Sequence, residues 1–292
     1  MAKTKKVLIT GSTGMLGSDL CQESSLDYQV FCLAKPIQET ENCFCADIAD
    51  RDAIRDIFRR IHPDIIIHTA AFSNVDGCEL NPDLALKINA EGTGNLAHYS
   101  KEIDAVFVYI GTDYVFSGNN NKPYKEDDDA SPVNVYGKTK LLGEEIVKGQ
   151  LKRYFIVRTS WLFGRGRKNF VDMVLEKAKT GSVIKIVSDK VSSPTYTKDL
   201  SLAILNLINK DHYGIFHIAN QGSCSWFDWA AKILEYAKLD ATKLSPISLK
   251  ELNLAAKRPL MTSLDISKFV KVTGYPMRSW QDALGEFICS KN

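Results

Sequence analysis

The sequence predicts an α/β fold: a Rossmann-like, doubly wound parallel sheet with a smaller C-terminal α/β substrate lobe. A glycine-rich turn at residues 11–17 follows the first apolar run. Short apolar runs then alternate with segments whose apolar residues recur at helical spacing. Strands that alternate with helices are joined by right-handed crossovers, which build a parallel sheet with helices on both faces.

The first strands and the first helix lie around the glycine turn. Residues 6–10 are an apolar run that ends at this turn, and a helix is expected from about Met15. Residues 29–33 form a second apolar run, and Cys43 and Cys45 alternate in a further short strand. Together these segments predict the first part of a parallel sheet.

The middle of the chain continues the alternation. Apolar residues at helical spacing over 53–61 predict a helix that Pro63 ends. Residues 65–69 are typical of a buried strand, a long helix is expected over 82–101, and 105–110 form the next strand. This order again predicts parallel strands that are connected by helices.

The second half is predicted from weaker signals. A helix is expected around residues 136–140 and a strand at 154–158. The later helices and strands are expected at 170–179, 183–187, 198–209, 214–219 and 226–238. We therefore expect an NAD(P)-binding Rossmann domain of residues 1–164 plus 198–220, and a substrate-binding lobe of residues 165–197 plus 221–292.

The composition is typical of a soluble globular protein, with 292 residues, 45% of them hydrophobic and 25% charged. A formal net charge of +2 argues against a nucleic-acid surface. No apolar stretch reaches the length of a signal-peptide core or a membrane span, so a cytoplasmic protein without a membrane partner is expected. The seven cysteines and five histidines show no ligand spacing, so reduced thiols and no metal are expected.

Gly11, Gly14 and Gly17 predict a dinucleotide-binding turn. The spacing is a variant of the common fingerprint, and a plain strand–helix turn is the alternative interpretation. Glycine suits the site because one permits the tight turn, one lets the backbone approach a pyrophosphate, and one allows close helix–strand contact. The position after the first strand and before a helix favours cofactor binding.

The end of the second strand favours NADPH, with NADH as the alternative. This strand runs into Ala34 and Lys35, and no acidic residue follows until Glu39. A basic residue here accommodates a 2′-phosphate, whereas an acidic one binds the ribose 2′-hydroxyl. Asp47 and Ile48 are placed to face the adenine, although Asp47 is also a candidate helix cap.

Thr112, Tyr136 and Lys140 form the candidate catalytic group. A tyrosine four residues before a lysine shares one helix face with it. An ammonium group nearby favours the phenolate and lowers the tyrosine pKa, so Lys140 is expected to tune Tyr136 as a proton donor to a carbonyl. Thr112, after a strand, is placed to hydrogen-bond the same carbonyl oxygen. A surface pair is the alternative for such a common spacing.

Further motifs occur in order along nearly the whole chain. They are Val7-Leu8-Ile9-Thr10-Gly11, His68-Thr69-Ala70-Ala71, Thr112-Asp113-Tyr114-Val115-Phe116, Arg158-Thr159-Ser160-Trp161-Leu162-Phe163-Gly164, Asn169-Phe170, Ser193-Pro194-Thr195-Tyr196-Thr197 and Arg258-Pro259. Their order and spacing resemble those of the extended short-chain dehydrogenase/reductases and, within them, the dTDP-4-dehydrorhamnose reductase family.

This resemblance implies NAD(P)H-dependent reduction of the C4 ketone of dTDP-4-dehydro-β-L-rhamnose to dTDP-L-rhamnose. Tyr136 would donate the proton, with Lys140 and Thr112 assisting. The expected cofactor contacts are Gly11, Ser12, Thr13, Gly14, Met15, Leu16, Gly17, Lys35, Asp47, Ile48, Thr69, Ala70, Ala71, Tyr136 and Lys140. The expected contacts with the nucleotide sugar are Thr112, Asp113, Trp161, Asn169 and Arg258.

The sequence departs from the family pattern at several positions. Many relatives have serine where Gly111 stands, and the stretch around Lys190 lacks a glutamine that often follows the aspartate there. The first glycine turn lacks the glutamate with which some relatives bind a metal between subunits. Metal dependence is therefore left open, and either a monomer or a homodimer is expected.

The motifs can be compared with three alternative functions. Sugar-nucleotide dehydratases have a glutamate where Tyr114 stands, which argues against them. An epimerase or reductase of another nucleotide-ketosugar stays open, although Lys35 argues mildly against a tightly held NAD. A non-catalytic, NADP-binding regulatory subunit also stays open, because the β subunit of methionine adenosyltransferase resembles this chain around Tyr136. The segment 158–164 follows the reductases more closely.

Aromatic residues gather in the expected helix 226–238, at Trp226, Phe227, Trp229 and Tyr236. A surface that stacks on a sugar ring is one interpretation. Aromatic residues at this spacing more often face a core, which is the interpretation that we favour.

Overall fold

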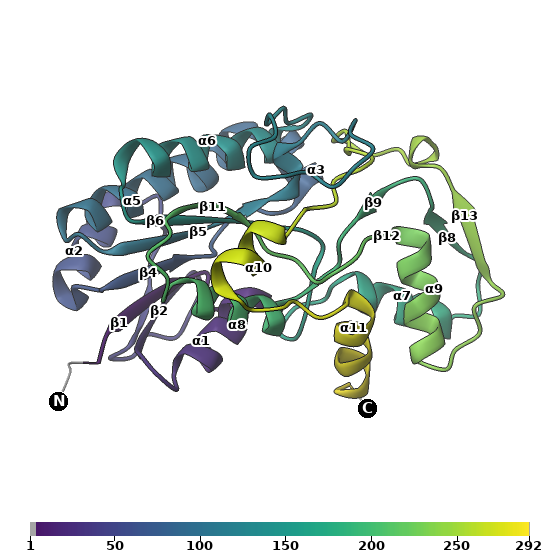
Figure 1. Ribbon diagram of the computed structural model, residues 1–292, viewed down its shortest axis with the longest axis horizontal. Coiled ribbons are helices and arrows are strands. Elements are labelled where there is room, and N and C mark those ends of the chain that lie inside the picture. The colour runs from purple at the N-terminus through teal and green to yellow at the C-terminus, as the bar shows by residue number, and fades with distance from the viewer. Residues whose placement is uncertain (1–3, 292) are drawn as a thin grey trace.

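The computed structural model describes residues 4–291, and within this range seven strands form one parallel sheet (Figure 1). Its strands are β1 (Lys6–Thr10), β2 (Gln29–Ala34), β3 (Cys43–Cys45), β4 (Ile65–His68), β5 (Val106–Thr112), β6 (Tyr154–Thr159) and β11 (Gly214–His217). Their order is β11-β6-β5-β4-β1-β2-β3. The predicted doubly wound fold is confirmed. The chain runs outward in both directions from β1 and β4, and Thr10 pairs with His68 there.

Helices cover both faces of this sheet. They are α1 (Met15–Ser24) and α8 (Thr197–Leu207) on one face, and α2 (Arg51–Ile61), α5 (Thr93–Glu102) and α6 (Val135–Gln150) on the other (Figure 1). Alternate residues of β1 explain the two layers. Val7 and Ile9 pack with α1 and α8, whereas Leu8 packs with α2 and α5. Burial of both faces requires strands that are apolar throughout, which is why these runs are continuous rather than alternating.

The predicted long helix over 82–101 is wrong as a single regular helix. After α3 (Val75–Leu80), the chain forms α4 (Pro82–Leu86), a π-helical segment at Lys87–Gly92, and then α5. The wide turn places the buried Asn89 side chain where it accepts a hydrogen bond from the Phe72 amide at 2.8 Å and donates to Thr139 Oγ1 at 3.1 Å. π-helical segments often occur near functional sites.

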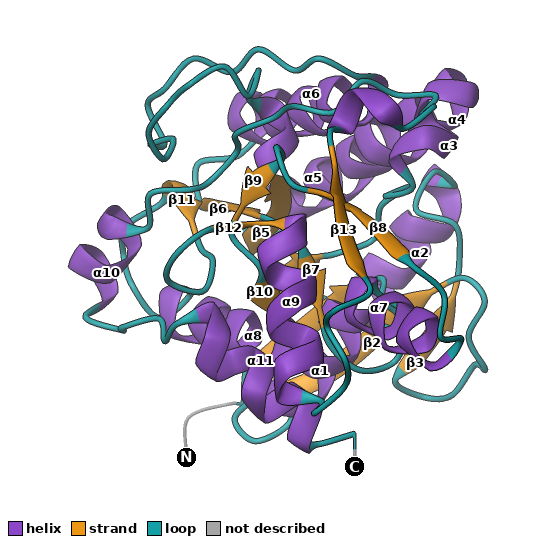
Figure 2. Ribbon diagram, turned by 90° about the vertical axis from the view of Figure 1, so that its right-hand side faces the viewer, coloured by secondary structure: helices purple, strands orange, loops and turns teal. Residues whose placement is uncertain are grey.

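A smaller lobe lies beside the sheet domain (Figure 1) and faces the viewer in Figure 2. It contains α7 (Phe170–Lys179), β8 (Ile184–Val187), β9 (Val191–Ser192), β12 (Cys224–Ser225), α9 (Trp226–Tyr236), β13 (Leu244–Ile247), a 3₁₀ turn at Leu249–Glu251 and α11 (Trp280–Cys289). β7 (Leu162–Phe163) pairs in parallel with β10 (Thr195–Tyr196) and connects the lobe to the sheet domain. Its core combines aliphatic side chains with several large aromatic ones, among them the buried Phe163, Trp229, Trp280 and Phe287.

One C-terminal segment that the sequence assigns to the lobe packs against the sheet domain instead. Helix α10 (Ser267–Thr273) lies against β11 and α8. Phe269 and Met277 are buried in the core on the α1 and α8 face of the sheet. The predicted division places these residues in the lobe, yet their side chains contribute to the sheet domain.

Two kinds of feature are absent from residues 4–291. No helix there is long and apolar enough to cross a membrane. No group of three or more His, Cys, Asp or Glu side chains there is arranged to hold a metal ion.

Candidate active site

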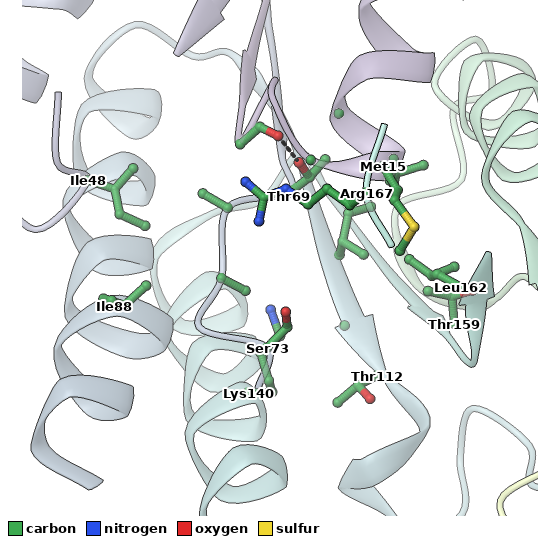
Figure 3. Close-up of a pocket in the computed structure, with 18 of the residues that line it drawn as sticks. Met15, Ile48, Thr69, Ser73, Ile88, Thr112, Lys140, Thr159, Leu162 and Arg167 are labelled. Carbon is green, nitrogen blue, oxygen red and sulfur yellow. Dashed lines mark hydrogen bonds between the residues drawn. The ribbon is translucent and has the colours of Figure 1, made fainter. Parts of the chain in front are cut away.

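A cavity of about 660 Å³ opens at the carboxyl ends of the central strands. It lies where the strand order reverses between β1 and β4, the point at which open parallel sheets bind ligands. Figure 3 shows Ile48 and Ile88 at one end, Met15 and Leu162 on the opposite wall, and Thr112 and Lys140 at the bottom of the view. Both the sheet domain and the lobe contribute to the lining.

The glycine turn forms one wall of the cavity and is tightly packed. Gly11 has a φ of +68°, and its amide donates to the Leu33 carbonyl at 2.7 Å. A Cβ at Gly17 would lie only 2.2 Å from the Gly11 carbonyl oxygen, so glycine is needed for α1 to approach the turn. The predicted residues Gly11, Thr13, Gly14, Met15, Leu16 and Gly17 all line the cavity.

Ser12 is the exception within the turn. Its side chain is buried away from the cavity, and its hydroxyl has no hydrogen-bond partner within residues 4–291. It lies close enough to Cys32 on β2 to lower the pKa of that thiol. The structure therefore does not place the Ser12 side chain among the cofactor contacts that the sequence predicts.

The segment after β4 forms the facing edge of the cavity. Thr69, Ala70 and Ala71 all line it, as predicted. Thr69 Oγ1 donates to the Thr10 carbonyl at 2.7 Å, and the Ala70 amide donates to Thr10 Oγ1 at 3.3 Å. Through these two hydrogen bonds, Thr10 at the end of β1 fixes the position of the segment that follows β4.

Lys35, Asp47 and Ile48 line the end of the cavity that the sequence assigns to the adenosine. Lys35 is 64% exposed and forms an ion pair with Asp47 at 3.2 Å. The Ala49 amide donates to Asp47 and is the main reason that the pKa of this carboxyl is lowered. Asp47 does not cap α2, because Asp50 does.

Thr112, Tyr136 and Lys140 all line the cavity, so the structure brings the predicted catalytic group together. Asn134 caps α6 by accepting from the Gly137 amide at 2.8 Å. A Cβ at Gly137 would lie 2.2 Å from the Tyr114 carbonyl oxygen. Glycine therefore lets α6 start against the chain that follows β5, which positions Tyr136 beside Thr112.

The electrostatics of this group differ from the expectation. Burial raises the pKa of Tyr136, and a hydrogen bond with Thr112 only partly opposes this shift. Burial also lowers the pKa of Lys140 to about 7, and its ammonium nitrogen lies 4.1 Å from the centroid of the Tyr109 ring. The expected lowering of the Tyr136 pKa by Lys140 is therefore not seen. Tyr136 is held in its neutral, proton-donating form.

Asp113 lines the cavity, but its carboxylate is largely engaged within the protein. It accepts from Thr262 Oγ1 at 2.5 Å, from Ser192 Oγ at 3.1 Å and from Thr112 Oγ1 at 3.1 Å. These bonds join β5 to the lobe and orient the Thr112 hydroxyl. If Asp113 contacts the sugar as predicted, its carboxylate must do so while it also accepts these three hydrogen bonds.

Lys190 completes the polar network beneath the cavity. It is fully buried, and its ammonium group donates to the Pro259 carbonyl at 2.7 Å. The rings of Tyr114 and Trp161 lie 4.9 and 5.7 Å from this nitrogen. Burial lowers the pKa of Lys190 to about 8, although Asp113 nearby opposes the shift.

We expect replacement of Lys190 with methionine to change how stability depends on pH. The pKa of Lys190 is about 8 in the folded protein and about 10.4 in an unfolded chain. Between these values only the unfolded state holds the proton, so raising the pH favours folding of the wild type. From about pH 8 to pH 10, the unfolding free energy should rise by about 2 kcal/mol relative to Lys190→Met. Urea unfolding of both proteins at the two pH values measures the difference between their unfolding free energies. The same difference at pH 8 and pH 10 would contradict the prediction.

Trp161 forms the wall of the cavity on the lobe side. It has a φ of +45°, and its ring stacks on Trp229 with a centroid separation of 5.6 Å. Trp229 is only 2% exposed, which agrees with the core interpretation of the aromatic helix. The indole nitrogen of Trp161 is buried without a hydrogen-bond partner within residues 4–291. The cavity wall thus has a rigid aromatic surface.

Asn169 and Arg258 are not among the residues that line the cavity. Asn169 caps α7 and donates to the Gly164 carbonyl at 2.9 Å, so its side chain is engaged in holding the loop. Arg258 pairs with Asp76 at 2.7 Å. Its Nη1 is buried and lacks a partner within the described residues. The Asn169 side chain therefore lies outside the cavity lining, its contact with the substrate stays a prediction, and Arg258 keeps one unused donor.

Sequence reasoning missed Arg167 among other lining residues, which include Ser73, Ile88, Thr159, Ser160 and Leu162. Arg167 reaches the cavity wall near Met15 from the loop between β7 and α7 (Figure 3). Gly166 in this loop has a φ of +88°. The signal was the run Gly164-Arg165-Gly166-Arg167, in which glycine and arginine alternate next to the predicted lobe.

The departure from the family pattern at Gly111 has a structural reason. A Cβ at Gly111 would lie 2.9 Å from Glu144 Oε1 and 3.1 Å from Arg158 Cγ. Arg158 and Glu144 form a buried ion pair at 2.7 Å directly behind β5. This pair occupies the space that a serine side chain would need.

The fold and this site define an extended short-chain dehydrogenase/reductase. The model of the family described as RmlD substrate binding domain matches residues 5–292. The chain belongs to this family, and the resemblance drawn from its motifs is confirmed.

Relatives agree over nearly the full length. The chain is 39% identical over 284 residues to the spore coat polysaccharide biosynthesis protein SpsK of Bacillus subtilis, covering 97% of this chain and 96% of that protein. It is 34% identical over 290 residues to the dTDP-4-dehydrorhamnose reductase of Mycolicibacterium smegmatis, covering 98% of this chain and 86% of that protein. The crystal structure of dTDP-4-dehydrorhamnose reductase from Bacillus anthracis in complex with NADP superposes with a TM-score of 0.92 at 38% identity, covering 99% of this chain and 100% of that one.

Proposed function

We propose that this protein reduces the C4 ketone of dTDP-4-dehydro-β-L-rhamnose to dTDP-L-rhamnose with NADPH. The observation that carries the proposal is the position of Thr112, Tyr136 and Lys140 in one cavity with the glycine turn. Relatives that match nearly the whole chain are named for this reaction. NADPH is favoured because a relative of 38% identity has a crystal structure in complex with NADP.

The residues of the cavity fit a dinucleotide. A Cβ at Gly11 would lie 2.7 Å from the Ala70 amide nitrogen, so glycine lets the chain after β1 and the chain after β4 pack closely along the cavity. The turn also stands at the start of α1, where amide groups and the helix dipole favour a phosphate. Ile48 and Ile88 offer an apolar surface for an adenine at the far end.

Proton transfer is the task of this chain's own residues. The nicotinamide supplies a hydride when it is bound. Tyr136 is held neutral by burial, so it can donate its phenolic proton to the oxygen that develops negative charge. Thr112 lies beside it, and its hydroxyl can donate to that oxygen once it turns away from Asp113. Lys140 lines the same cavity and, with a pKa of about 7, can take up and release a proton near neutral pH.

The nucleotide sugar is proposed to bind between the sheet domain and the lobe. Trp161 presents an aromatic wall there, and Asp113 carries a carboxylate at the bottom of the cavity. Arg258 has a buried, unpartnered Nη1 within the described residues, which suits a diphosphate oxygen if the side chain turns. We propose that the lobe around α7 and α9 supplies this half of the site.

Lys35 should contribute to the choice between NADPH and NADH. In Lys35→Ala the ratio of kcat/KM for NADPH to that for NADH should fall by roughly tenfold, because one charge-assisted contact to a 2′-phosphate is lost. Asp47→Asn should raise the ratio, since Lys35 loses its anionic partner at 3.2 Å. Steady-state kinetics with both cofactors measures these ratios. Equal ratios in the wild type and both variants would show that Lys35 does not contact the 2′-phosphate of NADPH.

The direct test is NADPH oxidation by the purified protein with freshly made dTDP-4-dehydro-L-rhamnose, followed by NMR of the product. Turnover that yields dTDP-L-rhamnose supports the proposal. Binding of NADPH without turnover would instead support a regulatory subunit or a different ketosugar substrate.

A further inference from the structure

Four of the seven cysteines lie at one edge of the sheet, outside the cavity lining. Cys21 on α1 contacts Cys32 on β2, with the two sulfur atoms 3.4 Å apart. Cys43 on the edge strand β3 is the register partner of Cys32, and Cys45 follows it two residues later. Register partners in parallel strands point to the same face, so Cys21, Cys32 and Cys43 form a thiol cluster. Each of these three side chains is partly exposed.

We propose that Cys21 and Cys32 are a peroxide-sensitive dithiol that closes to a disulfide and thereby weakens cofactor binding at the adjacent glycine turn. The effect on the cofactor depends on the proposed function, whereas the disulfide itself does not.

Cys32 is the nucleophile of this pair. Three groups act on its sulfur and lower its pKa: the Cys21 thiol most strongly, then the Cys43 thiol and the Ser12 hydroxyl. The pKa of Cys21 is raised by the same hydrogen bond. The thiolate is the reactive form of cysteine, and Cys32, which lies between Cys21 and its register partner Cys43, should form it more readily than Cys21.

The chemistry needs one equivalent of hydrogen peroxide and no other reagent. The Cys32 thiolate attacks the peroxide, an S–O bond forms as the O–O bond breaks, and the leaving hydroxide takes up a proton as water. The Cys21 sulfur then attacks the sulfenic sulfur, and a second water leaves with the Cys21 proton. Two thiols are thus oxidised to one disulfide while one peroxide is reduced to two waters.

The glycine turn is held between the two elements that this disulfide would draw together. The Gly11 and Ser12 amides both donate to the Leu33 carbonyl, directly after Cys32. α1 already touches the turn, since a Cβ at Gly17 would lie 2.2 Å from the Gly11 carbonyl oxygen. A disulfide is about 2.05 Å long, so the sulfur atoms must approach by roughly 1.3 Å. Rotation of the two side chains can supply part of this approach, and we expect the rest to shift α1 together with the turn that it touches.

Peptide mapping tests the disulfide without reference to cofactor or substrate. The reduced protein is treated with peroxide, its free thiols are alkylated, and it is cleaved after glutamate. Cleavage at Glu23 and Glu39 separates Cys21 from Cys32, and cleavage at Glu41 separates both from Cys43. We expect a peptide pair linked through Cys21 and Cys32, formed equally in Cys45→Ser, a matched variant with the neighbouring exposed thiol removed. A linkage of Cys32 to Cys43, or no linkage, would overturn the proposal.

Fluorescence titration with NADPH tests the consequence on the same samples. The Kd of the oxidised protein should be about tenfold higher, because a displacement of roughly 1 Å is large for backbone amides at hydrogen-bond distance. Dithiothreitol should restore the original Kd, and Cys32→Ser should show no response to peroxide. An unchanged Kd in a protein that carries the linkage would overturn the coupling. If the reduced protein fails to bind NADPH, the proposed function fails, while the peptide map still decides the disulfide.

Discussion

Replacing Tyr136 with phenylalanine is expected to lower kcat by roughly 10²–10⁴-fold and to leave the Kd for NADPH nearly unchanged. The substitution removes only the phenolic hydroxyl. Burial holds this group protonated, and it lies beside Thr112 at the bottom of the cavity. The alkoxide that forms at C4 would then lose its proton donor, whereas the glycine turn and its contacts would stay in place. Stopped-flow kinetics and an NADPH titration separate the two effects.

Tyr114→Phe is the matched control for this variant. Its ring centroid lies 5.8 Å from that of Tyr136, and it lines the same cavity. Phenylalanine at this position keeps an aromatic ring over the Lys190 ammonium group. We expect a loss at least tenfold smaller than for Tyr136→Phe, because Tyr114 is given no role in proton transfer. Equal losses in both variants would contradict the assignment of Tyr136 as the donor.

Replacing Gly17 with alanine is expected to weaken NADPH binding about 100-fold and to lower the unfolding free energy by about 2 kcal/mol. The new Cβ would lie 2.2 Å from the Gly11 carbonyl oxygen and 2.9 Å from Ser12 Cα. Both are backbone atoms on a turn that Leu33 holds in place, so α1 or the turn must move. Isothermal titration and urea unfolding measure the two effects.

Gly149→Ala provides the control for helical glycine. It lies in α6, and a Cβ there would meet nothing within 4 Å. This variant should bind NADPH like the wild type and be more stable by about 0.5–1 kcal/mol, since alanine favours helix. Unchanged NADPH binding in Gly17→Ala would show that the cofactor phosphates do not lie at this turn.

The parallel sheet could be predicted because its signals are local. Each strand is a continuous apolar run, and burial of both sheet faces requires such runs. Tyr136 and Lys140 were also predictable, since a four-residue spacing on a helix fixes a shared face. The π-helical segment was not, because it depends on the contacts of Asn89 with Phe72 and Thr139, far away in the sequence.

Side-chain partners explain the other differences between prediction and structure. Asp113 accepts from Thr262, which is 149 residues further along the chain, and no local pattern indicates this contact. Asn169 was expected at the substrate, yet its position at the start of α7 makes it a cap. The low Lys140 pKa likewise follows from burial, which the spacing of residues does not reveal.

The most direct test of the central claim is to follow deuterium from NADPH in which both hydrogens at C4 of the nicotinamide ring are replaced by deuterium. The purified protein is given this cofactor with dTDP-4-dehydro-L-rhamnose, and the product is examined by NMR. We predict dTDP-L-rhamnose that carries deuterium at C4 of the sugar, with one NADPH oxidised for each product formed. A product without the label at C4, or no oxidation of NADPH above background, would contradict the assignment of this protein as the reductase.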